Sequence, residues 1–483
     1  MKTIQDIFRT TDFRLIKGNL QQEIKGLAFD SRKVEEGFAF FAIRGTQTDG
    51  HQYVNQAISK GASLIVAEET DKNWEAGAII QVADSNLALS LASSAFYDFP
   101  SEKLNLIGVT GTNGKTTTVT LLYHLFKGLG YSCGLISTIR VLINDKEYPA
   151  THTTPDPVQL NSFFRQMADE NCSFAFMEVS SHAIAQKRIN GLAFKGGIFT
   201  NITHDHLDYH LTFRNYLETK KKFFDNLDKT AFSLVNADDR NSKFILQNTL
   251  AVKKTFGLKN PADFKAKIIE NSMNGLHLKI DDTDFYSEKP GVFNAYNLLG
   301  VYAAAVMCGE DKYKILELLS RPVDVDGRFQ LVFKNPQYRG IVDYAHTPDA
   351  LENVLKTISN AREKTQKIIT VFGCGGNRDK TKRPEMGKIS VIYSDKVIVT
   401  SDNPRDEDPQ DIINNILEGI PSGEMEKVLV IADREQAIKT ACMLAQSGDI
   451  ILLAGKGHET YQEIKGVKHH FDDREILLKY LKS

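Results

Sequence analysis

The sequence predicts an α/β protein of three domains: a mixed α/β N-terminal domain, a central phosphate-loop domain with a parallel sheet, and a C-terminal Rossmann-like domain. At 483 residues the chain is too long for one core, and its length favours about three domains. Short β-branched runs alternate with helical stretches, which is typical of parallel sheets. A glycine-rich turn separates one such run from the helix after it. We place the domains at 1–100, 101–326 and 327–483.

The first domain is expected to be a small mixed unit. Apolar runs predict strands over 38–43 and 63–67, with a helix over 53–60 between them. The polar patch Asp30-Ser31-Arg32 interrupts this pattern. The stretch 97–101 is then expected to link the first domain to the second.

The central domain opens on residues 108–118, Gly-Val-Thr-Gly-Thr-Asn-Gly-Lys-Thr-Thr-Thr, between a strand predicted over 104–109 and a helix over 118–129. A strand, a glycine turn and a helix N-terminus bind phosphate, because the backbone N–H groups point at the ligand. Lys115 would add a positive charge, and the hydroxyl of Thr116 can reach a magnesium ion. We therefore predict a nucleotide site, with a chance Gly-Lys-Thr loop as the alternative.

Polar residues follow two further predicted strands of this domain, 174–179 and 197–201. Glu178 ends the first strand, at the sheet edge where a carboxylate could hold magnesium on a nucleotide. A carboxylate that caps the next helix is the alternative. The second strand leads into Asn201-Ile202-Thr203-His204-Asp205-His206-Leu207-Asp208-Tyr209-His210. Three histidines and two aspartates in this run indicate a functional site, and magnesium suits a phosphate-binding edge better than zinc.

Lys220 stands in a run of three lysines that would by default face solvent. Phe213, Tyr216, Lys220, Phe223, Phe224 and Leu227, however, recur at helical spacing. This pattern places Lys220 on an apolar stripe, unlike Lys221 and Lys222. A buried lysine has a lowered pKa, and its free amine can react with carbon dioxide to give a carbamate. A lysine that extends its ammonium group to solvent is the alternative.

The third domain repeats the alternation, with strands predicted over 367–372, 396–400, 428–432 and 449–454. Its central strands end in polar, glycine-rich turns, as in a second nucleotide-binding-like sheet. These turns are Gly373-Cys374-Gly375-Gly376-Asn377-Arg378-Asp379-Lys380, Asp402-Asn403-Pro404-Arg405 and Gly455-Lys456-Gly457-His458-Glu459. Two arginines and a glutamate on neighbouring strand ends suit a ligand that carries a carboxylate and an amine. Surface ion pairing is the alternative.

Composition narrows the partners and the compartment. With 59 Lys+Arg against 61 Asp+Glu the net charge is −2, so no basic surface indicates nucleic acid. The five cysteines are scattered and odd in number, which favours free thiols in a reducing compartment. The N-terminus lacks an apolar signal core, and no run of about 18 apolar residues occurs. We expect a cytoplasmic monomer without membrane insertion.

Taken together, these segments resemble the Mur ligases of bacterial cell-wall synthesis, from about residue 27 to the C-terminus. The residues that carry the resemblance are the loop 108–117, Glu178 with Ser180-Ser181-His182, Asn201 with His206, Asn294 with Asn297, Arg328, and Asp343-Tyr344-Ala345-His346. Within the family, Asp30-Ser31-Arg32, Thr153-Thr154-Pro155-Asp156, Met177-Glu178-Val179-Ser180-Ser181-His182 and Gly455-Lys456-Gly457-His458-Glu459 are similar to the MurE type. Asp402-Asn403-Pro404-Arg405 is similar to the form of that type associated with meso-diaminopimelate.

The resemblance implies an ATP-dependent amide-bond ligase of peptidoglycan precursor synthesis. It would add meso-diaminopimelate to UDP-N-acetylmuramoyl-L-alanyl-D-glutamate through an acyl phosphate. The three domains would bind, in order, the UDP-precursor, ATP and the amino acid. Lys115, Glu178, His206 and Lys220 would be catalytic. One magnesium ion would be held by Thr116 and Glu178, and another by His206 and the carbamate of Lys220 (N6-carboxylysine).

The resemblance also implies three sets of ligand-binding residues. Those for ATP are Gly111, Thr112, Asn113, Gly114, Lys115, Thr116, Thr117, Asn294, Asn297 and Arg328. Those for the UDP-precursor are Ser31, Thr153, Thr154, Ser180, Gln186 and Arg188. Those for diaminopimelate are Arg378, Asp402, Asn403, Pro404, Arg405, Gly455 and Glu459.

Three other functions compete with this one. The same ligase could use L-lysine, but Arg405 would then face a cation without a partner, which is costly in a buried site. A folylpolyglutamate synthetase-like ligase shares the phosphate loop and the lysine, but would not need the Asp30-Ser31-Arg32 unit. A non-catalytic nucleotide switch would have no use for a second cluster that binds an amino acid.

Overall fold

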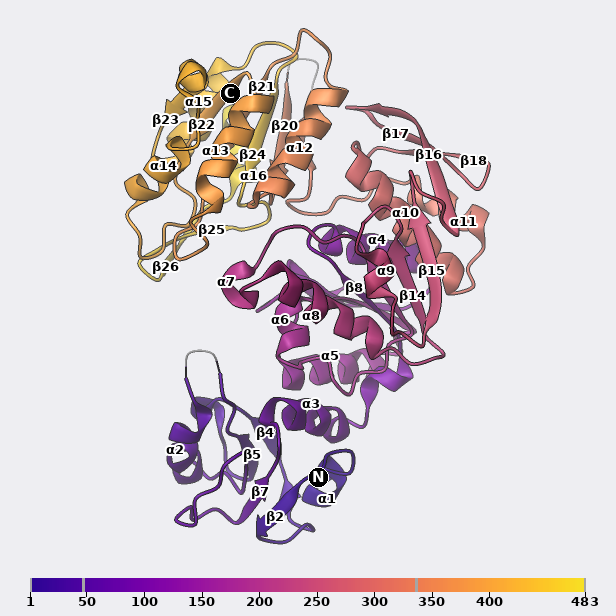
Figure 1. The fold of residues 1–483 in the computed structure, drawn as a ribbon, viewed down its shortest axis with the longest axis vertical. Helices are drawn as coiled ribbons and strands as arrows, with labels where there is room; N and C mark the ends of the chain where they lie inside the picture. The colour runs from indigo at the N-terminus through magenta and orange to yellow at the C-terminus, as the bar shows by residue number, and fades with distance from the viewer. Residues whose placement is uncertain (1, 46–47, 335–337, 482–483) are drawn as a thin grey trace.

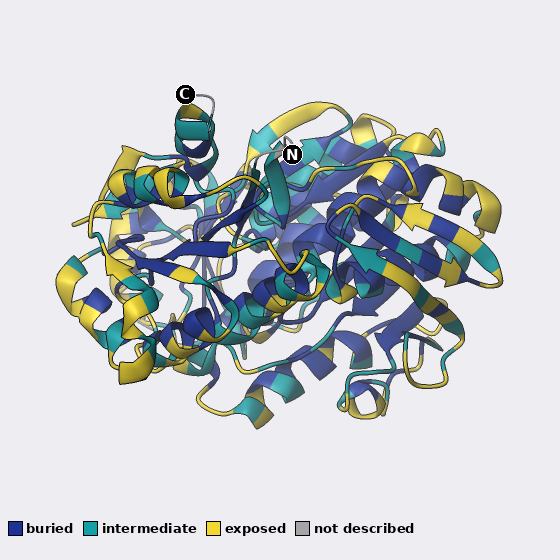
Figure 2. Cartoon of the chain, turned by 90° about the horizontal axis from the view of Figure 1, so that it is seen from above, coloured by how far each residue is buried: buried dark blue, intermediate teal, exposed yellow. Residues whose placement is uncertain are grey.

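The computed structural model describes residues 2–45, 48–334 and 338–481, and its three main sheets follow one another along the chain (Figure 1). The N-terminal sheet lies at the bottom of Figure 1, the central sheet in the middle and the C-terminal sheet at the upper left. Figure 2 shows that buried residues concentrate on the strands and on the inner faces of the helices. The predicted three-domain α/β fold is confirmed, whereas its limits at residues 100 and 326 stay predictions.

The N-terminal sheet has the order β2-β7-β6-β5-β4, and only β2 is antiparallel to its neighbour. Its strands are β2 Arg14–Lys17, β4 Gly26–Ala28, β5 Phe38–Phe41, β6 Leu64–Ala67 and β7 Ala78–Gln81, beside the short pair β1 Lys2–Thr3 and β3 Glu23–Ile24. The helices are α1 Ile4–Ile7, α2 Val54–Ser59 and α3 Ser85–Phe96. Because side chains alternate along a strand, Phe41 packs with α1 and α3 while Phe40 packs with α2.

The central sheet has eleven strands in the order β11-β10-β9-β12-β8-β13-β14-β15-β16-β17-β18. They are β8 Asn105–Thr110, β9 Cys133–Ile136, β10 Arg140–Ile143, β11 Lys146–Pro149, β12 Phe174–Glu178, β13 Gly196–Phe199, β14 Phe232–Asn236, β15 Val252–Gly257, β16 Phe264–Ser272, β17 Gly275–Ile280 and β18 Thr283–Ser287. The consecutive strands β9-β12-β8-β13-β14-β15-β16 of this sheet run parallel, as predicted. Antiparallel hairpins, which were not predicted, extend both edges of the sheet.

Helices cover both faces of the central sheet. One face carries α4 Lys115–Gly128, α10 Val292–Met307 and α11 Lys312–Leu319. The other carries α5 Pro157–Asp169, α6 Ser181–Ala185, α7 Leu207–His210, α8 Phe213–Asp225 and α9 Ser242–Ile245. This two-sided cover explains why the central strands are apolar on both faces.

The C-terminal sheet has the order β19-β20-β24-β21-β22-β23, with β19 antiparallel at one edge. Its strands are β19 Gln330–Lys334, β20 Arg339–Asp343, β21 Ile368–Phe372, β22 Lys396–Val399, β23 Val428–Val430 and β24 Ile450–Ala454, followed by the hairpin β25 Tyr461–Ile464 and β26 Val467–His470. Helices α12 Pro348–Ala361, α13 Lys382–Tyr393 and α14 Pro409–Leu417 pack on one face, and α15 Arg434–Leu444 and α16 Asp473–Leu481 on the other.

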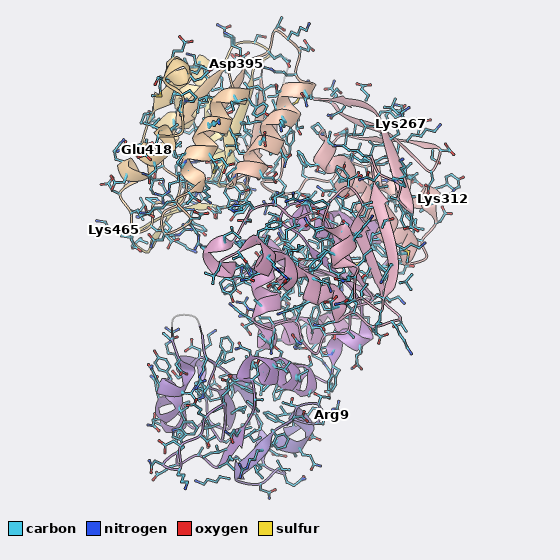
Figure 3. The ribbon with its side chains drawn as sticks, in the orientation of Figure 1. Arg9, Lys267, Lys312, Asp395, Glu418 and Lys465 are labelled. Carbon is cyan, nitrogen blue, oxygen red and sulfur yellow. The ribbon has the colours of Figure 1, made fainter. Side chains whose placement is uncertain are left out.

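The outer surface carries charges of both signs. Figure 3 shows Arg9, Lys267, Lys312, Asp395 and Glu418 at the periphery of different domains. Within residues 2–45, 48–334 and 338–481, no helix is long and apolar enough to cross a bilayer.

Candidate active site

A cavity of about 760 Å³ lies at the carboxyl ends of the central parallel strands, where the third domain meets the second. Its lining includes the phosphate loop, Glu178 after β12, Thr200 after β13 and Tyr344 after β20. Open parallel sheets bind ligands at this edge, because the loops that follow the strands converge there. The sequence placed the phosphate loop, Glu178 and His206 at one edge, and the structure brings all three into this cavity.

The phosphate loop is closed around the side chain of Lys115. Lys115 Nζ donates to the carbonyl oxygens of Gly111 and Thr112 at 2.9 and 2.8 Å. Gly114 has φ +85°, and a Cβ there would lie 2.5 Å from Asn297 Oδ1. Burial lowers the pKa of Lys115. The loop therefore has the tight, glycine-dependent form that a phosphate site requires.

Lys220 reaches the same loop from helix α8. Its Nζ donates to Gly111 O at 3.0 Å and lies 4.7 Å from the centre of the Tyr216 ring. The residue is 1% exposed, which excludes the alternative of an ammonium group extended into solvent. Burial, followed by the charge of Lys115, holds the pKa of Lys220 well below its usual value. A neutral amine that lines a cavity can form a carbamate.

The prediction that Lys220 differs from both its neighbours is wrong for Lys221. The side chain of Lys221 is 7% exposed, and its Nζ lies 2.7 Å from Asp225 Oδ1, one helical turn away. This ion pair compensates the buried charge. Lys222 is exposed, as predicted.

Glu178 is fully buried, and only one of its two carboxylate oxygens accepts a hydrogen bond from a described residue. Oε1 accepts a hydrogen bond from the backbone N–H of Thr138 at 2.7 Å, whereas Oε2 has no partner among the described residues. Helix α6 is capped by Ser180, whose Oγ accepts from Ala183 N at 3.2 Å, so the alternative of a capping Glu178 is excluded. A buried carboxylate oxygen without a partner fits a cation ligand.

The histidine run is divided by the fold. His206, in a left-handed conformation with φ +56°, lines the cavity with Asp205, and its Nε2 lies 3.4 Å from Asp205 Oδ2. Burial lowers the pKa of His206 to about 4. His210 is buried behind it, with Nε2 3.0 Å from Ser181 Oγ, while His204 is exposed. Among the residues that the structure describes, no three His, Cys, Asp or Glu side chains are grouped so that they could hold a metal ion.

Most residues predicted to bind the precursor line this cavity. They are Thr153, Thr154, Ser180 and Arg188. Arg188 donates to Thr154 O at 2.7 Å and, through Nε and Nη2, to Gln186 Oε1 at 2.9 and 2.6 Å, so Gln186 acts behind the lining. Ser31 is not part of the cavity: it is buried in the first domain, where its Oγ donates to Gln56 at 2.8 Å.

The third domain contributes to the nucleotide end of the cavity. Arg328 Nη2 donates to Thr116 Oγ1 at 3.2 Å, and its guanidinium lies 4.4 Å from the centre of the Tyr344 ring. Asn113 Nδ2 donates to Asp349 Oδ2 at 2.6 Å. Asn294, predicted as an ATP ligand, is buried and donates to Pro290 O at 2.8 Å rather than lining the cavity.

The sequence missed the far end of the cavity, between helices α10 and α12. Its lining there includes Asp238, Asn271, Phe293, Tyr296, Asn353, Thr357 and Asn360. These residues come from separate elements of two domains and share no motif. Only the packing of the domains brings them together.

The residues predicted to bind an amino acid, here called the amino-acid cluster, follow three neighbouring strands. Arg378 follows β21, Asp402 to Arg405 follow β22, and Gly455 and Glu459 follow β24. Asn403 Nδ2 donates to Glu459 Oε2 at 2.8 Å. Gly455 has φ +110°, and a Cβ there would lie 2.9 Å from Asp402 Oδ2. Burial, followed by the charge of Asp402, raises the pKa of Glu459. Lys456, for which the sequence indicates no role, is fully buried within this cluster.

The two arginines of this cluster differ in their partners. Arg405 has φ +52°; its Nη1 donates to Gly376 O at 2.7 Å and its Nε lies 3.3 Å from Glu463 Oε2. The expectation that Arg405 would be unpaired if L-lysine were the substrate is therefore wrong, because Glu463 of the β25–β26 hairpin pairs with Arg405. The tip of that hairpin carries Lys465 (Figure 3). Arg378 is exposed and has no hydrogen bond or ion pair to a described residue.

Tyr344 joins the cavity to the amino-acid cluster. Its ring lies 5.0 Å from the ring of His458, next to Glu459, and 4.4 Å from the guanidinium carbon of Arg328. A nucleotide phosphate and an amino acid bound at these two places would therefore be neighbours. A phosphate loop with a second buried lysine, joined to a cluster that holds Asp402, Arg405 and Glu459, is the arrangement of an ATP-dependent ligase.

The comparisons with known proteins agree with this class. Family models described as "Mur ligase family, catalytic domain", "Mur ligase middle domain" and "Mur ligase, glutamate ligase domain" match residues 23–97, 109–305 and 327–457. The chain belongs to the Mur ligase family.

Three similar proteins illustrate the relationship. A Bacteroides fragilis protein named UDP-N-acetylmuramoyl-L-alanyl-D-glutamate--2,6-diaminopimelate ligase is 54% identical over 463 residues, 96% of each chain. A Clostridioides difficile protein of the same name is 43% identical, over 98% of each. A solved structure titled with that ligase name is 31% identical with a TM-score of 0.70, over 100% of this chain and 99% of the other.

Proposed function

We propose that the protein uses ATP to join meso-diaminopimelate to UDP-N-acetylmuramoyl-L-alanyl-D-glutamate. The observation that carries the proposal is that the phosphate loop and four of the six predicted precursor residues line one cavity, which Tyr344 joins to the amino-acid cluster. Relatives named for this reaction match nearly the whole chain, which supports the choice of substrates.

The reaction has to overcome repulsion between two anions. A carboxylate oxygen of the D-glutamate attacks the γ-phosphorus of ATP, ADP leaves, and an acyl phosphate forms. Lys115 and the N–H groups at the start of α4 would bind the phosphates in the cavity. The neutral amine of diaminopimelate then attacks the acyl carbon, and phosphate leaves with the carboxylate oxygen.

Magnesium fits the donors that the cavity offers. Thr116 and Glu178 would hold one ion, and His206 and a carbamylated Lys220 would hold another. The unpartnered Oε2 of buried Glu178 supports the first site. When bound, magnesium would offset the charge of the reacting carboxylate and phosphate.

Carbamylation of Lys220 to N6-carboxylysine is supported by its environment. The amine has only Gly111 O and, at 3.5 Å, Thr110 Oγ1 as hydrogen-bond partners among the described residues. A carbamate would place a negative charge beside Lys115 where the neutral amine of Lys220 carries none, so the carbamate and the ammonium group of Lys115 would attract. Without carbon dioxide, the two lysines compete for the carbonyl of Gly111.

The three domains would divide the substrates between them. Residues 1–100 would bind the uridine nucleotide through Ser31, residues 101–326 would bind ATP, and residues 327–483 would bind diaminopimelate. We further propose that the enzyme acts as a monomer in the cytoplasm. Each substrate would then be bound by one chain.

Two other substrates would fit the same chemistry less well. An unpaired Arg405 does not exclude L-lysine, because Glu463 pairs with Arg405. The distal carboxylate of diaminopimelate would be bound by Arg405 together with the exposed Arg378. A Mycobacterium tuberculosis folylpolyglutamate synthase shares the fold with a TM-score of 0.61 at 16% identity, but the match covers only 76% of this chain. Relatives named for the UDP-precursor match 96% and 98% of this chain, which favours that substrate.

The proposal is tested by ATP hydrolysis with each substrate omitted in turn. We expect full turnover only with the UDP-precursor and meso-diaminopimelate together, and much lower turnover with L-lysine or L-glutamate. ATP hydrolysis at the full rate with neither acceptor would exclude the ligase.

A further inference from the structure

The ammonium group of Lys456 is buried beneath the amino-acid cluster. Lys456 follows strand β24, and its side chain is 0% exposed. Its Nζ lies 3.5 Å from Asp402 Oδ1 and 3.3 Å from Glu459 Oε2. Burying an isolated ammonium costs several kcal/mol, so it persists where carboxylates compensate it. Asp402 and Glu459 provide this compensation.

Lys456 also fixes the side-chain amide of Asn403, which contacts the carboxylate of Glu459. Its Nζ donates to Asn403 Oδ1 at 3.3 Å. The same oxygen accepts from Glu463 N at 2.9 Å, and Nδ2 of the amide donates to Glu459 Oε2 at 2.8 Å. With its oxygen held by two donors, the amide can present only its nitrogen to Glu459.

The charges of Asp402, Glu459 and Lys456, taken together, leave one negative charge in excess. Asp402 and Glu459 together carry −2 when ionised, and Lys456 brings the sum to −1. A substrate with one ammonium group near these carboxylates would bring it to zero. Because Lys456 is fully buried, it acts on the substrate only through the residues above it.

The other charged or titratable groups near Glu459 do not replace Lys456. They are Asp402, Tyr344, Tyr461 and Arg434. Arg434 forms an ion pair with Asp473, in which Nη2 lies 2.7 Å from Oδ2 and both side chains are fully buried. The charge of Asp402 raises the pKa of Glu459 and the ammonium of Lys456 opposes that rise.

We propose that Lys456 is a positioning residue that holds Asp402, Asn403 and Glu459 as one preformed acceptor for the ammonium group of the amino-acid substrate. The inference rests on the proposed function, because it takes the amino acid to bind at this cluster. It adds a buried counter-charge that the substrate does not touch.

The first test is Lys456→Met, which keeps the length of the side chain and removes the charge. We expect the KM for the amino acid to rise roughly 10- to 100-fold, as for the loss of a supporting partner behind a binding site. We expect kcat and the KM for ATP to stay within about threefold, since the phosphate loop is untouched. The acidic limb of kcat/KM for the amino acid should move to higher pH, because Glu459 then releases its proton less readily.

Lys468→Met is the matched control. Lys468 and Lys456 both lie near the Tyr461 ring, with Nζ at 4.1 Å and 5.7 Å from its centre. Unlike Lys456, Lys468 is exposed and contacts neither Asp402 nor Glu459. We expect wild-type kinetics and pH dependence for this variant. An equal rise of the amino-acid KM in Lys468→Met and Lys456→Met would overturn the proposal.

A charge-balanced variant separates positioning from folding. Asp402→Asn combined with Lys456→Met returns the cluster to a charge of −1, so it should shift the pH limb back and recover part of the thermal stability lost in Lys456→Met. If Lys456→Met does not fold, the double variant is compared with Asp402→Asn alone. An unchanged amino-acid KM and pH profile in either comparison would contradict the inference.

Thermal unfolding without substrate keeps this test apart from that of the proposed function. Lys456→Met should lose more melting temperature at pH 8 than at pH 5, because protonation of one carboxylate relieves their repulsion at low pH. A loss independent of pH would overturn the charge argument. Absence of amino-acid-dependent turnover in the wild type would instead reject the proposed function.

Discussion

The guanidinium of Arg328 donates a hydrogen bond to the hydroxyl of Thr116 over 3.2 Å, which joins the start of the third domain to the first turn of the phosphate-loop helix. The same guanidinium stacks on Tyr344 at 4.4 Å, so one side chain contacts both the nucleotide end of the cavity and the route to the amino-acid cluster. Arg328 thus links the position of the third domain to the phosphate loop, as the Asn113–Asp349 hydrogen bond also does.

Arg328→Ala should lower kcat/KM for ATP by about 10²-fold, since it removes one preformed positive donor from the phosphate site. Arg328→Lys should recover little of it, because a lysine cannot stack on Tyr344 and also donate in a fixed plane. Steady-state kinetics with varied ATP measure both. Arg321→Ala is the control, as that exposed arginine pairs only with Glu317 on the surface. Equal losses in Arg328→Ala and Arg321→Ala would contradict the prediction.

Lys220→Ala should reduce turnover by about 10²-fold or more, and bicarbonate should not restore it. Formate may be added to fill the space of the carbamate, and partial recovery is expected. The independent readout is ¹³C NMR after addition of labelled bicarbonate: a carbamate signal is expected in the wild type and not in Lys220→Ala. The control is Lys222→Ala, because Lys222 is exposed whereas Lys221 is buried. Near-normal turnover in Lys220→Ala would remove Lys220 from the reaction.

Arg405→Ala should raise the KM for diaminopimelate far more than the KM for ATP or for the precursor. Loss of a partner for a buried carboxylate costs about 2–5 kcal/mol, and here Glu463 loses its partner as well. L-lysine should gain relative to diaminopimelate, because the freed Glu463 favours an ammonium group. Competition between the two amino acids measures the preference, with Lys465→Ala at the hairpin tip as the control. If the wild type prefers L-lysine, or if Arg405→Ala leaves the preference unchanged, the choice of amino acid fails while the ligase remains.

The buried carboxyl of Asp343 should make stability depend on pH. Burial raises the pKa of Asp343 to about 6, against about 3.9 in the unfolded chain. Between these values the folded state holds more protons, so this group's contribution to stability falls as pH rises from about 4 to 6 and stays low above that. The difference corresponds to about 3 kcal/mol. Asp343→Asn keeps an oxygen that can accept from Phe329 N, which now donates over 2.6 Å, and should flatten this part of the profile. Chemical unfolding from pH 4 to 8 measures it; an unchanged slope would refute the assignment.

Local sequence patterns predicted the central parallel strands and the motifs that follow them, but not the antiparallel hairpins at the edges of the central sheet. Predicted strands at 367–372 and 396–400 correspond to β21 Ile368–Phe372 and β22 Lys396–Val399, because runs of buried β-branched residues indicate strands without reference to the rest of the chain. The phosphate loop and Lys220 were identified for the same reason: a glycine turn before a helix and a residue on an apolar stripe are properties of a short segment. Arg405 was also found from its motif.

Tertiary structure alone decided which charges are paired and which residues of different domains meet. Arg405 is paired by Glu463 of a hairpin 58 positions later, and Asp349 reaches Asn113 across the domain boundary. The residues between α10 and α12 form a lining only because two domains pack together. The physical reason is that burial and ion pairing depend on distances between segments far apart in sequence, whereas the period of a helix or strand is written locally. The sequence by itself thus determined the three α/β domains and predicted a chemistry for each motif, whereas the packing determined the charge balance of the site they share.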